Sequence, residues 1–321
     1  YDQLDLSRAT EAFLNCIPIA SMYGLKHGIL KHGPANTTAV LFEDLMDSKA
    51  FWLTPNTTPI YMALWLELGN EPMVIDTPPA VLGFLNDAWF KYVVDFGNAG
   101  PDKGKGGKYL VLPPGYKGNV PSGYFVVRPK TFWTWAMVRG STAQGLGHEV
   151  KAMEGKIRIY PLAKAKNLPK TEFIDISNMA YNTVSPNDFS FYEDLNKLIQ
   201  KEPIDSLDPE TRGLVAAIGI VKGKPFKPDA RMKKLLTEAV AIANATARAI
   251  VFQPREKEAF FYPDDKSSWV MAFAGKDVFF EVDGARNLDA RTAFYYCYTV
   301  LTPAMAHPPV GTGSDYAVAF L

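Results

Sequence analysis

The sequence predicts an α+β protein that is mostly β, with two β-sandwich domains of the jelly-roll type, an N-terminal helix and a helical segment between the domains. Three observations lead to this fold class. At 321 residues the chain exceeds the roughly 250–300 residues at which a single hydrophobic core stops growing. Short apolar runs separated by Gly/Pro turns fill the first half. Helical periodicity then replaces them before strand-like runs return near the end.

The first residues form the pattern of an amphipathic helix. Apolar side chains recur at spacings of three and four from Leu6 to Tyr23, which is the stripe of a helix with one buried face. Pro18 lies inside this pattern, and a proline in a helix interior removes a backbone hydrogen bond. We therefore expect a helix here with a kink at Pro18.

The segment from Ala39 to Arg139 predicts a β-sandwich, because short strands alternate with turn sequences such as Pro78-Pro79. In its last strand Trp133 and Trp135 alternate with Thr134, so we expect both tryptophans on the buried face of a sheet. The strands are expected over residues 40–45, 60–68, 73–75, 89–96, 109–112, 124–128 and 132–138.

The second part opens with helices and closes with strands. Three pairs read as helix starts with a capping residue or proline: Ser185-Pro186, Asp208-Pro209 and Pro228-Asp229. Strands are expected over residues 269–273, 278–282, 294–301 and 316–321. We place the domains at 1–170, with the N-terminal helix, and at 171–321, with the helical segment and the start of a second sandwich.

Composition excludes several classes of partner. Lys+Arg and Asp+Glu both number 34, so no net field draws nucleic acid or anionic lipid. No run of 18 apolar residues is present, which predicts a soluble chain without a membrane span. Cys16 and Cys297 each lie in an apolar run, which favours buried free thiols, with a disulfide bridge as the minor alternative.

Motifs for cofactors and metals fail at defined positions. The glycine-rich run from Gly100 to Lys108 lacks the Walker spacing, so we interpret it as a flexible charged loop. Gly145-Leu146-Gly147 is followed by Val150 where a dinucleotide loop needs glycine, and no cofactor is predicted. No metal-ligand spacing is found, and no metal site is predicted, for His27, His32, His148 and His307.

Aromatic side chains and carboxylates supply the candidate site. Most of the six tryptophans are expected in the core, but aromatic rings flanked by carboxylates also bind sugars. The ligand-binding candidates are Trp89, Tyr92 and Asp87, and the catalytic candidates are Asp95 and Asp102, as a carboxylate pair for glycoside hydrolysis. The alternative is that Asp102 and its lysine and glycine neighbours form a solvated turn.

Three segments resemble a known family. The runs are Asp95–Gly123 (DFGNAGPDKGKGGKYLVLPPGYKGNVPSG), Gly219–Asp229 (GIVKGKPFKPD) and Gly311–Ala317 (GTGSDYA). The first is similar to the signature of the bacterial DUF1254 domain, and the second to the segment that leads into DUF1214. The resemblance implies an extracytoplasmic bacterial protein, periplasmic or secreted, that is built on β-sandwich domains. It supplies no catalytic residues.

Two functions from different classes follow. The first is a protein that binds a glycan or other polar polymer in a groove, with hydrolysis as an additional activity. The alternative is a non-enzymatic structural or assembly protein with capsid-like jelly-roll domains. The run from Tyr316 to Leu321 is apolar to its last residue, and an uncovered apolar strand is an aggregation site. We therefore expect a partner to cover it, as a separate C-terminal chain or a second copy.

Overall fold

The computed structural model describes residues 1–140, 145–262, 267–271, 278–305 and 317–319. Its contacts divide the chain into two compact units. We call Met22–Val184 with Lys201–Ser206 the sheet unit. Tyr1–Ser21, Ser185–Gln200 and Leu207–Leu321 form the helical unit. The first 21 residues thus group with the later helices, whereas the sequence placed them in the first domain.

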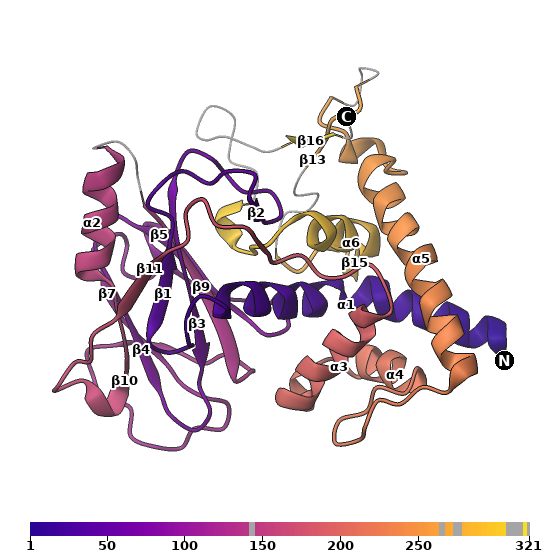
Figure 1. Cartoon of the computed structure of the whole chain (residues 1–321), viewed down its shortest axis with the longest axis horizontal. Helices are drawn as coiled ribbons and strands as arrows, with labels where there is room; N and C mark the ends of the chain where they lie inside the picture. Colours follow the sequence, from indigo (N-terminus) through magenta and orange to yellow (C-terminus); the bar gives the residue numbers. More distant parts are fainter. Residues whose placement is uncertain (141–144, 263–266, 272–277, 306–316, 320–321) are drawn as a thin grey trace. The chain divides into compact units, whose positions relative to one another are not determined.

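The sheet unit contains two larger β-sheets (Figure 1). The six-stranded sheet has the order β11-β1-β3-β9-β5-β6, and the four-stranded sheet has the order β10-β4-β7-β8. Neighbours are antiparallel except in the pairs β1–β11 and β7–β8. The six strands are β1 (Thr38–Leu41), β3 (Ile60–Glu67), β5 (Leu82–Asp87), β6 (Tyr92–Gly97), β9 (Trp133–Gly140) and β11 (Glu172–Asp175). The four strands are β4 (Met73–Thr77), β7 (Gly107–Val111), β8 (Phe125–Val127) and β10 (Arg158–Pro161).

Smaller elements complete the sheet unit. A parallel two-stranded ladder joins β2 to β12. The short helix α2 contributes Val150 and Met153 to the main core. These elements are β2 (Ala50–Phe51), α2 (Leu146–Lys156), η1 (Leu162–Lys164), β12 (Tyr181–Asn182) and η2 (Ile204–Ser206).

The main core lies between the two sheets. Met62 and Leu64 of β3 belong to the same buried cluster as Ile75 of β4 and Val111 of β7. Alternation puts every second side chain of each strand into this cluster. The first part is therefore a two-layer β structure, as predicted, although β2, β5, β10 and β11 were missed.

Both faces of the six-stranded sheet are covered. Trp133 and Trp135 share one face, as predicted, and Trp135 is fully buried. Thr134 points to the opposite side, where the inter-sheet core lies, and it is also fully buried. The expectation of a single buried face was therefore wrong, because alternation shows which residues share a face but not whether the other face is open.

The helical unit is built on four later helices and most of the first one (Figure 1). α1 continues through Pro18 as one helix. Asp208 and Asp229 cap α4 and α5, each accepting from the backbone N–H three residues later at 2.9 and 2.7 Å, as predicted. α3 begins at Ser190 rather than after Ser185-Pro186. The helices are α1 (Asp2–Leu30), α3 (Ser190–Lys201), α4 (Pro209–Ala217), α5 (Ala230–Phe252) and α6 (Leu288–Cys297).

The strand predicted over residues 294–301 is wrong, because residues up to Cys297 belong to helix α6. Asn287 caps α6 by accepting from Ala290 N–H at 2.9 Å, and Phe294 and Tyr295 are buried in it. In the predicted strand over 316–321, Ala317–Val318 (β16) pair with Val270–Met271 (β13), and the other residues except 319 lie outside the described part. The remaining short elements are η3 (Lys257–Ala259), β14 (Glu281–Val282), β15 (Ala285–Arg286) and η4 (Pro303–Met305).

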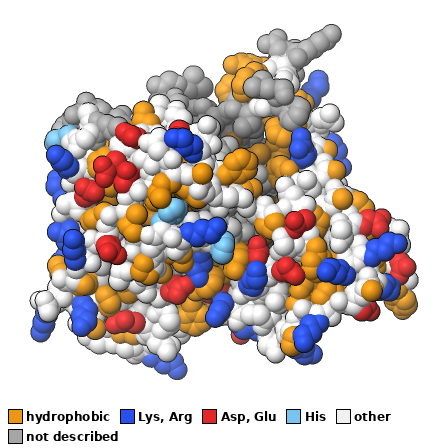
Figure 2. All heavy atoms as spheres, in the orientation of Figure 1, with side chains coloured by type: hydrophobic (Ala, Val, Ile, Leu, Met, Phe, Trp, Pro, Cys, Tyr) orange, Lys and Arg blue, Asp and Glu red, His pale blue; other side chains and the backbone are white. Residues whose placement is uncertain are grey.

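More described residues are helical than extended, so the chain is a mixed α/β protein rather than mostly β. Among the described residues, α5 is long and apolar enough to cross a membrane, with a mean hydropathy of 1.4 in its most apolar window. One face of α5, including Leu236, Val240 and Ala243, is buried, as is usual for a long apolar helix that packs in a protein core. Figure 2 shows acidic and basic side chains interspersed over the face viewed, in keeping with their equal numbers.

Candidate functional site

The candidate site lies on the outer face of the six-stranded sheet, opposite the inter-sheet core. Residues directly opposed in antiparallel strands share a face. Trp135 opposes Trp65 on one side and Asn86 on the other, and Phe84 opposes Asp95. This register assigns to the outer face Tyr61, Trp65, Glu67, Trp133, Trp135, Arg139, Phe84, Asn86, Tyr92 and Asp95.

A β-bulge brings two of the predicted residues to this face together. Tyr92 and Asp95 are three residues apart, so regular alternation would place them on opposite faces. The pairing of β5 with β6 shifts between Leu85 and Asn86, which restores both side chains to the outer face. The charge of Asp95 contributes, after burial, to a raised pKa of Tyr92. The two residues therefore interact.

Aromatic rings pack over the middle of the outer face. Trp65 and Trp135 stack with centroids 6.1 Å apart, and Phe84 meets Trp135 edge-on at 5.3 Å. Trp52, just after β2, lies 6.4 Å from Trp135 and 6.3 Å from Tyr181 of β12. The ring of His32 meets that of Tyr181 at 5.1 Å, and burial lowers the pKa of His32. These rings form one continuous cluster.

Several polar atoms of this cluster are buried without a hydrogen-bond partner among the described residues. They are the indole nitrogens of Trp65 and Trp135, the hydroxyl of Tyr181 and Nε2 of His32. Burial also raises the pKa of Tyr181, which keeps its hydroxyl protonated. Native proteins leave few buried donors unpaired. Polar atoms from outside the described chain, such as those of water or a ligand, would therefore form favourable hydrogen bonds with these groups.

One end of the outer face opens into a cavity of about 240 Å³ beside Trp133. The last turns of α1 supply most of its wall, and Trp133 of β9 supplies the rest. The lining residues are Tyr23, Lys26, His27, Leu30, Lys31 and Trp133. Tyr23 and His27, one helical turn apart, stack with centroids 6.2 Å apart.

Two charged side chains fix Trp133. The Glu202 carboxylate is fully buried and accepts hydrogen bonds from the backbone N–H groups of Phe132 and Trp133 at 2.6 and 2.9 Å. Lys26 Nζ lies over the Trp133 ring, 2.8 Å from its centroid, and forms a 2.5 Å ion pair with Glu67. Burial lowers the pKa of Lys26, and Glu67 opposes this effect. Sequence reasoning missed Lys26, Glu67 and Glu202.

Asp87 and Trp89 come together in the turn between β5 and β6 and are not arranged as a binding platform. Asp87 Oδ1 accepts from the N–H groups of Trp89 and Lys91, both at 2.9 Å. Burial raises the pKa of Asp87 to about 6. The Trp89 ring is 2% exposed, and its indole N–H donates to Ser206 Oγ at 2.6 Å.

Asp102 organises the glycine-rich loop. Its carboxylate accepts from Gly97 N–H at 2.7 Å, from Gly106 N–H at 2.9 Å and from the Tyr109 hydroxyl. Gly97 has φ +71°, and an added Cβ would meet Val81 O, so glycine is required there. At 4% exposure Asp102 is not part of a solvated turn, and the expectation of one was wrong because three donors hold the carboxylate inside the loop.

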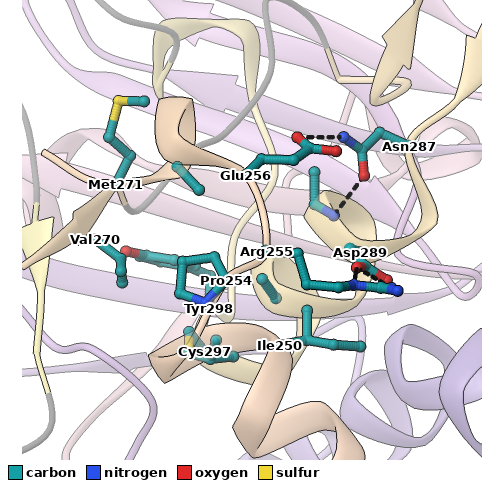
Figure 3. A pocket seen from close by; sticks show the side chains of 14 residues that line it. Ile250, Pro254, Arg255, Glu256, Val270, Met271, Asn287, Asp289, Cys297 and Tyr298 are labelled. Carbon is teal, nitrogen blue, oxygen red and sulfur yellow. Dashed lines mark hydrogen bonds and ion pairs between the residues drawn. The ribbon is translucent and has the colours of Figure 1, made fainter. Parts of the chain in front are cut away.

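A second pocket, of about 50 Å³, lies in the helical unit (Figure 3). Its rim carries an ion pair between Arg255 and Asp289 at 2.5 Å and a hydrogen bond from Asn287 to Glu256 at 3.4 Å. Cys297 also lines this pocket and is not part of a disulfide bond. The remaining lining residues are Ile250, Val251, Pro254, Ala259, Val270, Met271, Ala290, Ala293 and Tyr298.

Thiols and metals give no additional site. Cys16 and Cys297 do not form a disulfide bond, and burial raises the pKa of both thiols to about 12. Within the described part of the chain, no group of three or more His, Cys, Asp or Glu side chains is placed to hold a metal ion. His307 lies outside that part.

Comparison with known proteins bears on the fold. No curated protein matches the chain. The crystal structure of the VPA0106 protein from Vibrio parahaemolyticus is similar, with a TM-score of 0.62, 14% identity and coverage of 94% of this chain and 69% of that one. Residues 36–161, which hold most of the outer face and both larger sheets except β11, match the family described as "Protein of unknown function (DUF1254)". Residues 36–161 of this chain are therefore similar to the DUF1254 family.

Proposed function

We propose that this protein binds a glycan or other polar polymer on the outer face of the six-stranded sheet. The binding site would be the cavity beside Trp133, together with the neighbouring part of that face. The proposal includes an extracytoplasmic location, periplasmic or secreted, as expected from the sequence resemblance, which also suggests a DUF1214-like second part.

The observation that carries the proposal is the cavity of about 240 Å³ with Trp133 in its wall. Ligand pockets span roughly 300–1,000 Å³, so this cavity suits one unit of a polymer rather than a large cofactor. Trp133 and Tyr23 contribute aromatic rings to the wall of the cavity, and Lys26, His27 and Lys31 contribute polar groups. Aromatic platforms beside hydrogen-bonding side chains suit sugar rings, which have apolar faces and polar edges.

The buried polar groups of the outer face support the same proposal. Trp65 and Trp135 present indole N–H donors without partners in the described chain, next to the buried side chain of Asn86. A polyhydroxylated ligand carries many acceptor oxygens. Ordered water molecules between the cavity and the buried indole groups would mediate hydrogen bonds from these groups to the ligand.

Binding has more support than hydrolysis. Asp87 and Asp102 hold backbone N–H groups and stabilise their own loops, so neither is free to act on a substrate. Asp95 lies on the outer face next to Tyr92, and Glu67, on the same face, pairs with Lys26. Among the predicted carboxylates, Asp95 is the one to test for hydrolysis, and under a hydrolytic role Asp95→Asn would abolish the activity while keeping the size of the side chain.

The test is a binding screen against soluble polysaccharides by affinity electrophoresis, with the wild type, Trp133→Ala and Trp269→Ala. Trp269 is an exposed tryptophan of the helical unit and serves as the matched control. We expect Trp133→Ala to lose retardation by a polymer that retards the wild type and Trp269→Ala. Equal retardation of all three proteins contradicts the proposed site. Chromogenic glycosides assay hydrolysis in parallel.

A specific observation also favours the assembly alternative. Several large apolar side chains of the helical unit are exposed, namely Tyr262, Trp269, Phe279, Val282 and Leu288. Exposed apolar side chains that form a contiguous patch mark protein interfaces. Under this second candidate function the chain forms homo-oligomers through these exposed side chains, with jelly-roll-like domains as the building blocks. Light scattering after gel filtration distinguishes a monomer from such an assembly.

A further inference from the structure

We propose that the ligand of the Trp133 cavity is anionic, a carboxylate-bearing glycan such as a polyuronate. This inference rests on the proposed function and specifies the chemistry of its ligand. It concerns the cavity in the sheet unit whose wall is formed by Tyr23, Lys26, His27, Leu30, Lys31 and Trp133.

Basic side chains line the cavity, although the chain as a whole carries no net charge. Lys+Arg and Asp+Glu number 34 each. Yet Lys26, His27 and Lys31 are half of the residues that line the cavity, and none of its described lining residues is acidic. A concave site lined by charges of one sign raises the local concentration of ligands of the opposite charge.

The helix geometry explains why these groups converge. Leu30 follows Lys26 by four residues along α1, and Lys31, directly after the helix, follows His27 by four. The two pairs therefore form neighbouring rows on the helix surface. Tyr23 extends the His27 row by one turn and stacks on the His27 ring. A single ligand in the cavity therefore meets the aromatic and the cationic side chains together.

The two lysines have different roles. Lys26 is held between Glu67 and the ring of Trp133, so the carboxylate already neutralises much of its charge. Lys31 is exposed at the cavity and is the cation best placed to pair with an incoming carboxylate. Charge-assisted hydrogen bonds of this type are about twice as strong as neutral ones.

The buried groups of the adjacent outer face also favour a ligand with hydrogen-bond acceptors. An indole nitrogen donates hydrogen bonds and does not accept them. The buried indole groups of Trp65 and Trp135 can thus be satisfied only by acceptor atoms, and Tyr181 is kept protonated by its raised pKa. Donors and cations together favour a ligand rich in oxygen acceptors with negative charge.

The basic side chains at the end of α1 have a second possible role, in helix stability, which a separate measurement distinguishes from ligand binding. Positive side chains near the C-terminus of a helix interact favourably with its free carbonyl groups. His27 lies in the last turn of α1, and Lys31 follows the helix directly. If this were their whole role, replacing Lys31 would lower the stability of the protein and leave ligand binding unchanged.

The experiment compares polygalacturonate with the same polymer after methyl esterification, which removes the charge and keeps the sugar. Dextran sulfate is the sulfate-bearing anion. The proteins are the wild type, Lys31→Gln, Trp133→Ala and Lys117→Gln. Lys117 is an exposed lysine on the loop after β7, so its replacement makes the same charge change elsewhere on the sheet unit. Thermal unfolding of each protein is measured alongside.

We expect polygalacturonate to bind the wild type and Lys117→Gln alike, roughly tenfold more weakly to Lys31→Gln, and not detectably to Trp133→Ala. Equal affinity for the esterified polymer, or unchanged binding by Lys31→Gln, overturns the charge assignment and leaves the proposed function standing. Binding of dextran sulfate without polygalacturonate overturns the choice of carboxylate. Failure of every polymer, charged or neutral, to bind overturns the proposed function itself.

Discussion

Trp65 and Trp135 lie directly opposite each other on neighbouring strands and stack with centroids 6.1 Å apart and planes inclined by 21°. Both indole N–H groups are buried without a partner among the described residues. Their rings stabilise the sheet unit through packing, whereas their unpaired donors oppose its stability. Such a combination is expected where a protein keeps polar groups ready for a ligand.

Replacing Trp135 by Phe separates these two effects. The variant keeps an aromatic ring on the outer face but lacks the N–H donor. Leaving a buried donor unsatisfied costs about 1–3 kcal/mol, which offsets the loss of packing area, so we expect the free energy of unfolding in urea to change by less than about 1.5 kcal/mol. Ligand binding should weaken. A loss of stability above about 3 kcal/mol with unchanged binding would mean that the indole N–H is already satisfied in the free protein.

Replacing Glu202 by Gln tests how Trp133 is held. The carboxylate accepts one backbone N–H on each oxygen, from Phe132 and Trp133. A carboxamide has one acceptor oxygen, so one N–H faces an NH₂ group in a buried place. We expect a loss of about 1–3 kcal/mol in the free energy of unfolding and a changed Trp133 environment in near-ultraviolet circular dichroism. Glu71→Gln, at an exposed turn, is the control and should behave like the wild type.

The pH dependence of stability should show the titration of Asp87. Its pKa is about 6 in the folded protein and 3.8 for the unperturbed group, so between these values the folded state holds a proton that the unfolded state has released. The contribution to stability is therefore full below pH ~4 and is lost as the pH rises through ~6, by up to about 3 kcal/mol. Asp87→Asn keeps an acceptor for both N–H groups and does not titrate.

The measurement for Asp87 is the difference in unfolding free energy between the wild type and Asp87→Asn at several pH values. We expect the wild type to lose stability relative to Asp87→Asn as the pH rises from about 4 to about 6. A constant difference over that range is inconsistent with the raised pKa. Asp87→Ala, which loses both hydrogen bonds, should be less stable than Asp87→Asn at every pH.

The two thiols should react slowly in the native protein. Burial raises the pKa of Cys16 and of Cys297 to about 12, so little thiolate is present at pH 8. With a disulfide reagent we expect slow labelling of the folded protein, with Cys297 first because it lines the pocket of Figure 3, and rapid labelling of both thiols in denaturant. Fewer than two reactive thiols in unreduced, denatured protein would reveal a bridge.

The sequence predicted correctly those features that depend on a few neighbouring residues, such as the start of a helix. Asp208 and Asp229 cap α4 and α5 because an N-cap depends on the next three residues. The run Phe294–Leu301 suggested a strand because it is rich in aromatic residues, yet its first part is helical. The cap at Asn287 and the packing of α6 against α5 explain the helix, and that packing depends on residues more than 30 positions away.

The candidate site could be predicted only in part for the same reason. Tyr92 and Asp95 were identified from their types, but the bulge that brings them to one face arises from pairing with β5, which was itself missed. Glu202 lies about 70 positions from Trp133, and nothing near it in the sequence indicates that it binds that backbone. Asp102 was predicted as a catalytic candidate, but its three donors show a structural role in its loop.

Nuclear magnetic resonance of the protein labelled with ¹⁵N-tryptophan tests the central claim most directly. The six tryptophans give six indole N–H signals, which single Trp→Phe variants assign. On addition of oligogalacturonate we expect the signals of Trp133, Trp135 and Trp65 to shift in a saturable manner, while the signal of the exposed Trp269 stays in place. Saturable binding of the oligosaccharide that leaves Trp133 unmoved, or that moves Trp269 instead, would contradict a ligand site on the outer face.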